Sequence, residues 1–263
     1  MDSITALARK HGLFVIEDAA HAVGSYYGER MCGTIADIGC YSFFANKNLP
    51  VGEGGMLVTH DRELHDKLTR VRSHGMTSYT WDRAKGRANT YDVVELGYNY
   101  RPTEINSAIG LAQMEKLPDN NKTIDGLFGG YVKALENNEH IMLPFSGLAE
   151  HGRYARHLFP IVLDENINRE AFIQKLKALG VQTSIHYLPV HKFTYYRSIL
   201  QRSQAEGLGN TEAYGQRVVT LPMHPLLTTH DIGKICSCIN SCLLYTSPSP
   251  RDNLHNLGIR LML

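Results

Sequence analysis

The chain has almost no net charge, few cysteines and no long hydrophobic run. Its 263 residues carry 27 lysines and arginines against 26 aspartates and glutamates, a formal net charge of +1, and no basic cluster. DNA and acidic membrane surfaces are therefore not favoured as partners. No apolar stretch is long enough to cross a bilayer, and the polar first residues do not resemble a signal peptide. We expect a cytoplasmic protein that binds neither nucleic acid nor a membrane.

The cysteines form no CxxC pair and no zinc-binding spacing. They are Cys32, Cys40, Cys236, Cys238 and Cys242. Reduced thiols fit the cytosol. Cys238 and Cys242 lie four residues apart in an expected helix, so a metal interpretation exists, although ordinary packing is the simpler one. His186, His191 and His224 lack an acidic ligand at a suitable spacing. We therefore predict no metal site.

Helix and strand patterns alternate through the first half of the chain. The apolar run 13–16 has no polar alternation, which predicts a strand covered on both faces, as in a parallel sheet flanked by helices. A helix capped by Ser3 is expected to end at Gly12. Further strands are expected at 41–44 and 55–59, and helices at 63–71 and 103–114. A buried strand so close to the amino terminus needs flanking strands, so we expect that a preceding segment is missing.

The second half predicts a smaller α+β unit. After Pro118, three glycines make the connecting segment a poor helix. The expected elements beyond it are strands at 157–163, 182–187 and 218–221 and helices at 169–179 and 229–241. The predicted division is 1–117 for the rest of a large domain, 118–156 for the connection, 157–242 for the small domain and 243–263 for a tail. Two prolines interrupt the tail, which resembles translated adapter sequence and is expected to be non-native.

Lys47 lies between the aromatic run 41–44 and the glycine-rich turn 52–55, a setting that a solvated surface lysine does not need. Asp18 ends another predicted strand, and ligands of open α/β sheets bind beyond the carboxyl ends of the strands. A carboxylate and an amine facing one crevice suggest pyridoxal phosphate, whose aldehyde needs an amine and whose ring nitrogen needs an anion. From spacing alone, however, such an aspartate is more often a helix cap or a turn former.

Six blocks of sequence, in order along the chain, resemble the DegT/DnrJ/EryC1/StrS sugar aminotransferases. The blocks are VIEDAAHAVG (15–24), YSFFANKN (41–48), GEGGM (52–56), HG (74–75), GYNYR (97–101) and HYLPVH (186–191). These enzymes have the aspartate aminotransferase-like fold of type I pyridoxal-phosphate enzymes. The resemblance extends from the start of the chain to about residue 240. It implies a large α/β domain with a mainly parallel sheet, here incomplete, followed by a small α+β domain.

The resemblance also implies roles for the site residues. Lys47 would be the Schiff-base lysine, and Asp18 would hold the pyridine nitrogen of pyridoxal 5'-phosphate. Ser42 would donate its hydroxyl to the cofactor phosphate. Asn99 would reach the phosphate of a neighbouring subunit's cofactor, which makes a homodimer with shared active sites part of the expectation. Without the resemblance, Ser42 would be an ordinary strand residue and Asn99 a turn residue.

The same resemblance implies roles for His21 and for the pair His186 and Tyr187. His21 stands where glutamine is commoner in the family, and both side chains can offer a hydrogen bond to the cofactor. Alternatively, His21 is hydrogen-bonded within a helical turn. His186 and Tyr187 belong to the segment that the family brings towards the nucleotide-linked sugar.

The glycines at 52–55 lack the lysine and hydroxyl offsets of a phosphate-binding P-loop, so we interpret them as a tight turn beside the lysine. Family members also carry an earlier glycine-plus-hydroxyl turn for the phosphate and an aromatic ring that stacks on the cofactor. Neither is found before Leu13, so we expect a chain truncated at its amino terminus.

The expected function is transfer of an amino group from glutamate or glutamine to a keto sugar on a nucleoside diphosphate. The presence of Lys47 favours transfer over dehydration. Two alternatives stay open: a non-catalytic binding or regulatory protein that keeps the fold, and another pyridoxal-phosphate reaction, since the same lysine and aspartate serve several.

Overall fold

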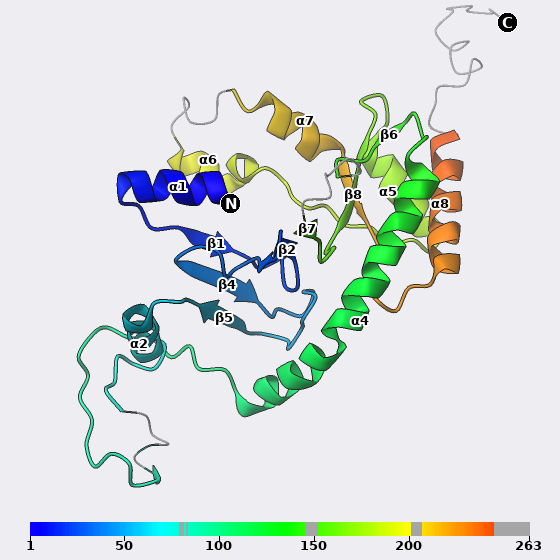
Figure 1. The fold of residues 1–263 in the computed structure, drawn as a ribbon. Helices are drawn as coiled ribbons and strands as arrows, with labels where there is room; N and C mark the ends of the chain where they lie inside the picture. Colours follow the sequence, from blue (N-terminus) through cyan, green and yellow to red (C-terminus); the bar gives the residue numbers. More distant parts are fainter. Residues whose placement is uncertain (79–81, 83, 146–151, 201–206, 245–263) are drawn as a thin grey trace, which may run out of the picture. The chain divides into compact units, whose positions relative to one another are not determined.

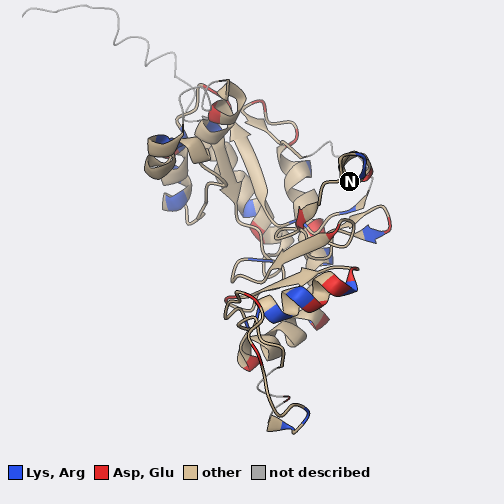
Figure 2. Cartoon of the chain, turned by 90° about the vertical axis from the view of Figure 1, so that its left-hand side faces the viewer, with Lys and Arg blue, Asp and Glu red and all other residues tan. Residues whose placement is uncertain are grey.

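The computed structural model describes residues 1–78, 82, 84–145, 152–200 and 207–244. Its contacts divide the chain into two compact units (Figure 1). The first unit comprises Met1–Lys122 and Glu150–His157, and the second comprises Thr123–Ala149 and Leu158–Leu263. The sequence predicts a tail at 243–263, but residues 243 and 244 are the last two of a helix, and residues 245–263 lie outside the described residues. On the face seen in Figure 2, basic and acidic residues are interspersed.

The first unit is built on a three-stranded sheet in which β4 lies between β1 and β5 (Figure 1). β1 (Ile16–Asp18) is parallel to β4 (Ile38–Ser42), and β4 is antiparallel to β5 (Gly55–Val58). A mainly parallel sheet is expected. The described part of this sheet contains one parallel pair of strands and one antiparallel pair. A second small sheet joins β3 (Arg30–Met31), β2 (Tyr26–Tyr27) and β7 (Gly152–Arg153).

Two helices of the first unit agree with the sequence pattern. α1 (Asp2–His11) ends at Gly12, whose φ of 63° is the left-handed conformation that closes helices. It starts before Ser3, so the expected Ser3 cap is wrong. α2 (Arg62–Val71) is capped by Asp61, whose carboxylate accepts the amide of Leu64.

Side chains of β1 and β4 alternate between a buried face and an open face. Glu17 and Tyr41 point to the buried face, where Ala19, Val23, Leu49 and Val51 form the core of the unit. Asp18, Cys40 and Ser42 lie on the opposite side of the same strands, and we call their side the open face. Two of the predicted site residues, Asp18 and Ser42, therefore lie on the open face.

The strand expected at 13–16 is wrong in its bounds and in its burial. β1 starts at Ile16, and the side chains of Leu13, Phe14 and Ile16 are 63%, 76% and 63% exposed. The physical reason is its position, because β1 is an edge strand whose one partner among the described strands is β4. An apolar run on an edge strand stays open on the side that no second strand or helix covers.

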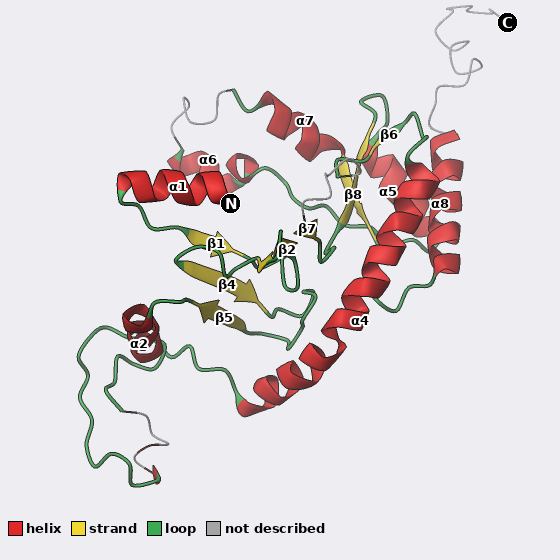
Figure 3. Ribbon diagram, viewed as in Figure 1, coloured by secondary structure: helices red, strands yellow, loops and turns green. Residues whose placement is uncertain are grey.

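The expectation of a poor helix after Pro118 is also wrong. α4 (Glu104–Leu135) is one helix of 32 residues that contains this proline and all three glycines (Figure 3). Its carboxyl-terminal half buries five large side chains, namely those of Ile124, Leu127, Phe128, Tyr131 and Leu135. Packing of one apolar face therefore outweighs the low helix propensity of glycine, which costs about 1 kcal/mol per residue relative to alanine.

The second unit is an antiparallel sheet packed against helices. β8 (Phe159–Leu163) lies between β6 (Ile141–Met142) and β9 (Val218–Leu221). The sheet and the end of α4 pack with α5 (Arg169–Ala178) and α8 (Thr229–Leu244) around a common core. All five residues of β8 are buried, as its unbroken apolar sequence predicts. The α+β architecture expected for this half is confirmed.

The strand expected at 182–187 is reduced to a single bridge, in which Ser184 and Thr220 exchange two backbone hydrogen bonds. The remaining elements of the second unit are η1 (Val190–Lys192), α6 (Thr194–Ile199) and α7 (Gly209–Arg217). None of the helices described in either unit is long and apolar enough to cross a membrane.

Candidate active site

Asp18 and Ser42 lie on the open face at the carboxyl ends of two parallel strands. Asp18 is paired with Cys40, and Ser42 follows two residues later on the same side of β4. The Asp18 carboxylate accepts the amide of Ala20 at 3.1 Å, which makes it a turn former as well. Burial, and to a smaller extent the charge of Asp18, raise the pKa of the Cys40 thiol. The structure thus brings a carboxylate and a hydroxyl to one edge of the sheet.

The residue opposite Ser42 is a glycine, so no side chain fills the space beside the serine on that strand. Gly55 of β5 is its register partner, and a Cβ atom added there would lie 2.8 Å from the carbonyl oxygen of Tyr41. The Ser42 Oγ accepts the amide of Phe44 at a long 3.3 Å. This bond uses an acceptor position, so the hydroxyl proton remains available for a ligand.

Lys47 is carried by a loop that is closed at its base and anchored in the core. The amide of Phe43 donates to Gly54, and the amide of Val51 donates back to Phe43, each at 2.9 Å. Leu49 and Val51 are buried in the core of the unit. The Lys47 amide donates to the carbonyl of Phe44 at 2.9 Å. A defined loop therefore presents this lysine.

The Lys47 side chain is half-buried, and no carboxylate within the described residues forms an ion pair with it. Gly52, five residues later, has φ of +94°, a conformation that other residues rarely adopt. The tight turn that the glycine-rich sequence predicts after the lysine is confirmed.

Asn48, next to Lys47, makes side-chain hydrogen bonds with three other residues. Its Nδ2 donates to Asn121 Oδ1 of α4 at 3.0 Å and to the carbonyl of Arg156 at 3.4 Å. Its Oδ1 contacts His157 Nδ1 at 3.1 Å. Sequence reasoning missed this group, because His157 lies 109 positions away from Asn48 and no local pattern links them.

His21 belongs to the same neighbourhood as the lysine loop. Its ring lies 4.2 Å, centroid to centroid, from the ring of His157, with the two planes tilted by 50°. Because His157 in turn contacts Asn48, the turn after β1 and the loop after β4 share one contact group. The role of His21 towards a cofactor stays a proposal.

Asn99 lies in an exposed part of the first unit, where it pairs with Ser73 and accepts a hydrogen bond from Arg101 at 3.2 Å. The HG block (74–75) and the GYNYR block (97–101) each contain a glycine, and these two glycines lie against each other. The backbones of Gly75 and Gly97 touch, so that a Cβ atom on Gly97 would lie 2.0 Å from the amide nitrogen of Gly75. Only glycine allows this approach, which fixes the segment that carries Asn99.

His186 and Tyr187 belong to the second unit, in the segment between α5 and η1. His186 Nδ1 lies 3.0 Å from the hydroxyl of the buried Thr220, whereas the Tyr187 side chain is 58% exposed. The peptide bond between the two residues is cis. Pro189 packs against Gly215 of α7, where a Cβ atom would lie 2.5 Å from the proline ring.

An ion cluster fixes the far end of this segment. Glu212 Oε1 lies 2.8 Å from Lys192 Nζ and 3.0 Å from His191 Nε2. The hydrogen bonds from Lys192 and, next, from His191 hold the pKa of the Glu212 carboxyl below its usual value. The segment that carries His186 and Tyr187 is therefore tied to α7 and β9, and the tyrosine ring is presented to solvent.

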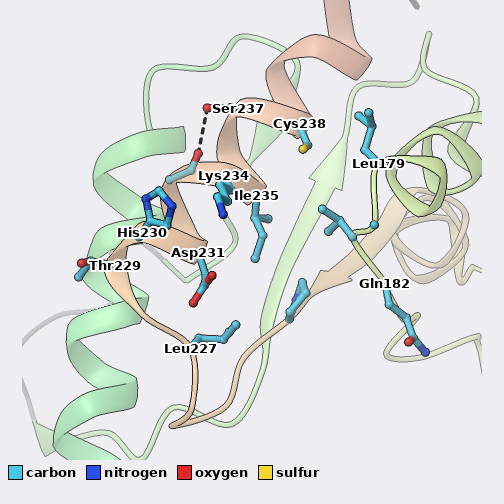
Figure 4. A pocket seen from close by; sticks show the side chains of 14 residues that line it. Leu179, Gln182, Leu227, Thr229, His230, Asp231, Lys234, Ile235, Ser237 and Cys238 are labelled. Carbon is cyan, nitrogen blue, oxygen red and sulfur yellow. Dashed lines mark hydrogen bonds between the residues drawn. The ribbon is translucent and has the colours of Figure 1, made fainter.

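The second unit also has a cavity of about 960 Å³ between the first turns of α8 and the chain after α5. Figure 4 shows Thr229, His230 and Lys234 on one side and Leu179 and Gln182 on the other. None of the predicted site residues lines it. No group of three or more histidine, cysteine, aspartate or glutamate side chains with metal-binding geometry occurs among the described residues.

The residues of the first unit fit pyridoxal phosphate chemically. A carboxylate suits the ring nitrogen, a hydroxyl on the same face suits the phosphate, and an amine without a carboxylate partner suits the aldehyde. Asp18, Ser42 and Lys47 supply these three groups from two adjacent strands and the loop that follows one of them.

Comparisons with known proteins agree with this chemistry. The family model described as the DegT/DnrJ/EryC1/StrS aminotransferase family matches residues 1–240. The spore coat polysaccharide biosynthesis protein SpsC of Bacillus subtilis is 37% identical over 244 residues, which cover 91% of this chain and 62% of that protein. The chain therefore spans less than two thirds of this curated relative.

Solved structures give the same assignment. Helicobacter pylori PseC, an aminotransferase involved in the biosynthesis of pseudoaminic acid, is 27% identical with a TM-score of 0.83, over 93% of this chain and 63% of that one. S. venezuelae DesV, solved in complex with a ketimine intermediate, is 27% identical with a TM-score of 0.81, over 94% and 62%. The chain belongs to the DegT/DnrJ/EryC1/StrS aminotransferase family.

Proposed function

We propose that this protein is a pyridoxal-phosphate-dependent aminotransferase that transfers an amino group from glutamate or glutamine to a keto sugar linked to a nucleoside diphosphate. The observation that carries the proposal is the placement of Asp18 and Ser42 on one open face, with the Lys47 loop directly after the strand of Ser42. The relatives support the substrate class, because SpsC serves polysaccharide biosynthesis and PseC serves pseudoaminic acid biosynthesis.

Each residue has a distinct task in this proposal. When bound, pyridoxal phosphate supplies an electron sink that stabilises negative charge on the substrate carbon. Lys47 would hold the cofactor through its Nζ and would also move a proton to and from the substrate carbon with the same atom. The Asp18 carboxylate would keep a proton on the ring nitrogen through a charge-assisted hydrogen bond. The Ser42 hydroxyl and a ring nitrogen of His21 would donate hydrogen bonds to the cofactor.

The sugar nucleotide is assigned to the segment of His186 and Tyr187. Support comes from the exposed Tyr187 ring on a backbone that Thr220, Gly215 and Glu212 hold in place. An aromatic face on a fixed backbone suits a sugar or base ring, because few rotamers are lost on binding. We also propose a cytoplasmic location, supported by the five cysteines, which form no disulfide within the described residues, and testable by cell fractionation.

Two experiments test the function: borohydride trapping of the cofactor on its lysine, and the half-reaction of the bound cofactor with the amino donor alone. The protein is mixed with pyridoxal phosphate, reduced with borohydride and digested, and the pyridoxyl group is expected on Lys47. Addition of glutamate before reduction should convert the cofactor to its pyridoxamine form, which absorbs at shorter wavelength. A pyridoxyl group on another lysine would refute the site. Labelling of Lys47 without conversion by glutamate or glutamine would favour the non-catalytic alternative, and loss of a substrate hydroxyl instead of amination would favour dehydration.

We further propose a homodimer with shared active sites, in which Asn99 reaches the cofactor phosphate of the neighbouring subunit. The support is the surface around Asn99, where the side chains of Leu96 and Tyr100 are 81% and 70% exposed. Large exposed apolar side chains that lie together are typical of protein–protein interfaces. Sedimentation velocity should show a dimer that weakens when Leu96 and Tyr100 are both replaced by serine. A monomeric wild-type protein at micromolar concentration would contradict the proposal.

A further inference from the structure

We propose that Asn48 is a positioning residue for Lys47 and that His157 is the partner that orients Asn48. The inference rests on the proposed function only in taking Lys47 as the reacting residue. Its own basis is a group of hydrogen bonds that joins two other segments of the first unit to the residue directly after the lysine.

The Asn48 amide is fixed on both sides. Its Nδ2 has two hydrogens, and both have acceptors, Asn121 Oδ1 and the carbonyl of Arg156. Its Oδ1 can only accept, so His157 Nδ1 carries the proton in their 3.1 Å contact. With both ends of the amide bonded, rotation of the Asn48 side chain would break hydrogen bonds whichever way it turned.

The partners of Asn48 are themselves anchored. Asn121 Nδ2 donates to the carbonyl of Val23 at 3.2 Å, which ties α4 to the turn after β1. The segment of Arg156 and His157 is tied to the same turn, because the Ala155 amide donates to Ser25 Oγ at 2.9 Å. Side-chain hydrogen bonds therefore hold the Lys47 loop against the turn after β1, in addition to the backbone bonds that close the loop on itself.

This arrangement has a consequence for the lysine. A lysine side chain has many accessible rotamers and needs a fixed backbone to present its amine in one place. Asn48 supplies that fixed point one residue away. His157 extends it to His21 through their ring contact at 4.2 Å, so a single group holds the lysine loop and the histidine expected beside the cofactor.

Hydrogen exchange tests the positioning without any cofactor. In Asn48→Ala, the amides of Lys47 and Val51, which are bonded within the loop, are expected to exchange about tenfold faster than in the wild type, the change that loss of about 1.4 kcal/mol produces. Asn138→Ala is the matched control. It removes an asparagine that also bonds to a second asparagine, Asn240, but in the second unit. Exchange in the Lys47 loop should be unchanged there.

Two substitutions at His157 separate its hydrogen bond from its ring packing. His157→Phe keeps a ring beside His21 but cannot donate to Asn48, whereas His157→Gln can donate but has no ring. We expect faster exchange of the Lys47 amide in the phenylalanine variant and near wild-type exchange in the glutamine variant. Should Asn48→Ala not fold, the phenylalanine variant decides, because it removes the bond to Asn48 while a ring stays beside His21. Unchanged exchange in that variant would overturn the proposal.

A second measurement links the loop to the reaction. The share of borohydride-trapped pyridoxyl groups that is found on Lys47, relative to all lysines, should fall several-fold in Asn48→Ala and in His157→Phe, and should stay near the wild-type share in His157→Gln. The two proposals fail differently. If the wild type is labelled on another lysine, the proposed function is wrong, while the exchange rates still decide whether Asn48 holds the loop. If Asn48→Ala leaves both exchange and labelling unchanged, the positioning role is wrong and the proposed function stands.

Discussion

Replacement of Lys47 by alanine is expected to reduce the rate at which glutamate converts the bound cofactor by at least about 10²–10⁴-fold. This is the range in which a positioned proton-transfer group contributes to catalysis, and the lost covalent anchor adds to it. The same variant should give no borohydride-trapped adduct at position 47. Absorbance of the cofactor follows the rate, and mass spectrometry of the reduced, digested protein follows the adduct.

The structure offers a matched control for this loss. Lys67 is an exposed lysine of α2 in the same unit, and Lys67→Ala should leave both readouts unchanged. Lys47→Arg keeps a positive charge but cannot form an imine, so it should be as inactive as the alanine variant. An arginine variant with near wild-type turnover would show that position 47 contributes charge alone, which would refute its covalent role.

In the same assay, Asp18→Asn is expected to separate attachment of the cofactor to Lys47 from the rate at which glutamate converts the cofactor. The variant keeps the size of the side chain and its turn but loses the charge that the ring nitrogen needs. A charge-assisted hydrogen bond of about 1.5–3 kcal/mol corresponds to a loss of roughly 10–150-fold. Trapping on Lys47 should persist. Loss of trapping together with turnover would show that Asp18 supports the fold of the site rather than the reactivity of the ring.

Local patterns draw attention to two residues of the candidate site, Lys47 by its aromatic and glycine-rich flanks and Asp18 by its place at a strand end. Ser42, and the roles proposed for all three residues, come from the resemblance to the family. The parallel register of β1 and β4 then brings Asp18 and Ser42 to one face, as the rule for open α/β sheets predicts. Such patterns can be read from the sequence because each depends on residues a few positions apart.

Longer-range features could not be read from the sequence. The contact of Asn48 with His157 depends on how a segment more than a hundred residues later folds back. The continuation of α4 through its glycines depends on the core that its apolar face enters, since local propensity alone argues for a break. The exposure of the run 13–16 depends on which strands are present beside β1. In each case the structure is determined by contacts with residues distant in the sequence, which local patterns do not reveal.

The buried carboxylate of Glu17 leads to the largest expected effect on stability. It lies next to Asp18 on the opposite face of β1 and is 9% exposed. One oxygen accepts the amide of Gly33 at 2.8 Å, and the other accepts the amides of Ile35 and Ala36, the latter at 2.7 Å. Three backbone donors therefore depend on one side chain.

Glu17→Ala is expected to lower the free energy of unfolding by about 3–5 kcal/mol, because it leaves these donors, partly buried, without an acceptor. Glu17→Gln should cost less, about 1–3 kcal/mol. Its carbonyl can still accept from Ile35 and Ala36, while its amide group faces the amide of Gly33. Denaturant unfolding measures the change, and hydrogen exchange at these backbone amides locates it.

The exposed Glu63 of α2 provides the reference, since Glu63→Ala should change stability by no more than about 0.5 kcal/mol. Equal unfolding midpoints for the Glu17 and Glu63 alanine variants would contradict the role given to the buried carboxylate. The effect should also reach the site, because Asp18 is the next residue on the strand. If the proposed function holds, Glu17→Gln should slow cofactor conversion only to the extent that it loosens β1, so exchange at the Asp18 amide and the rate should change together.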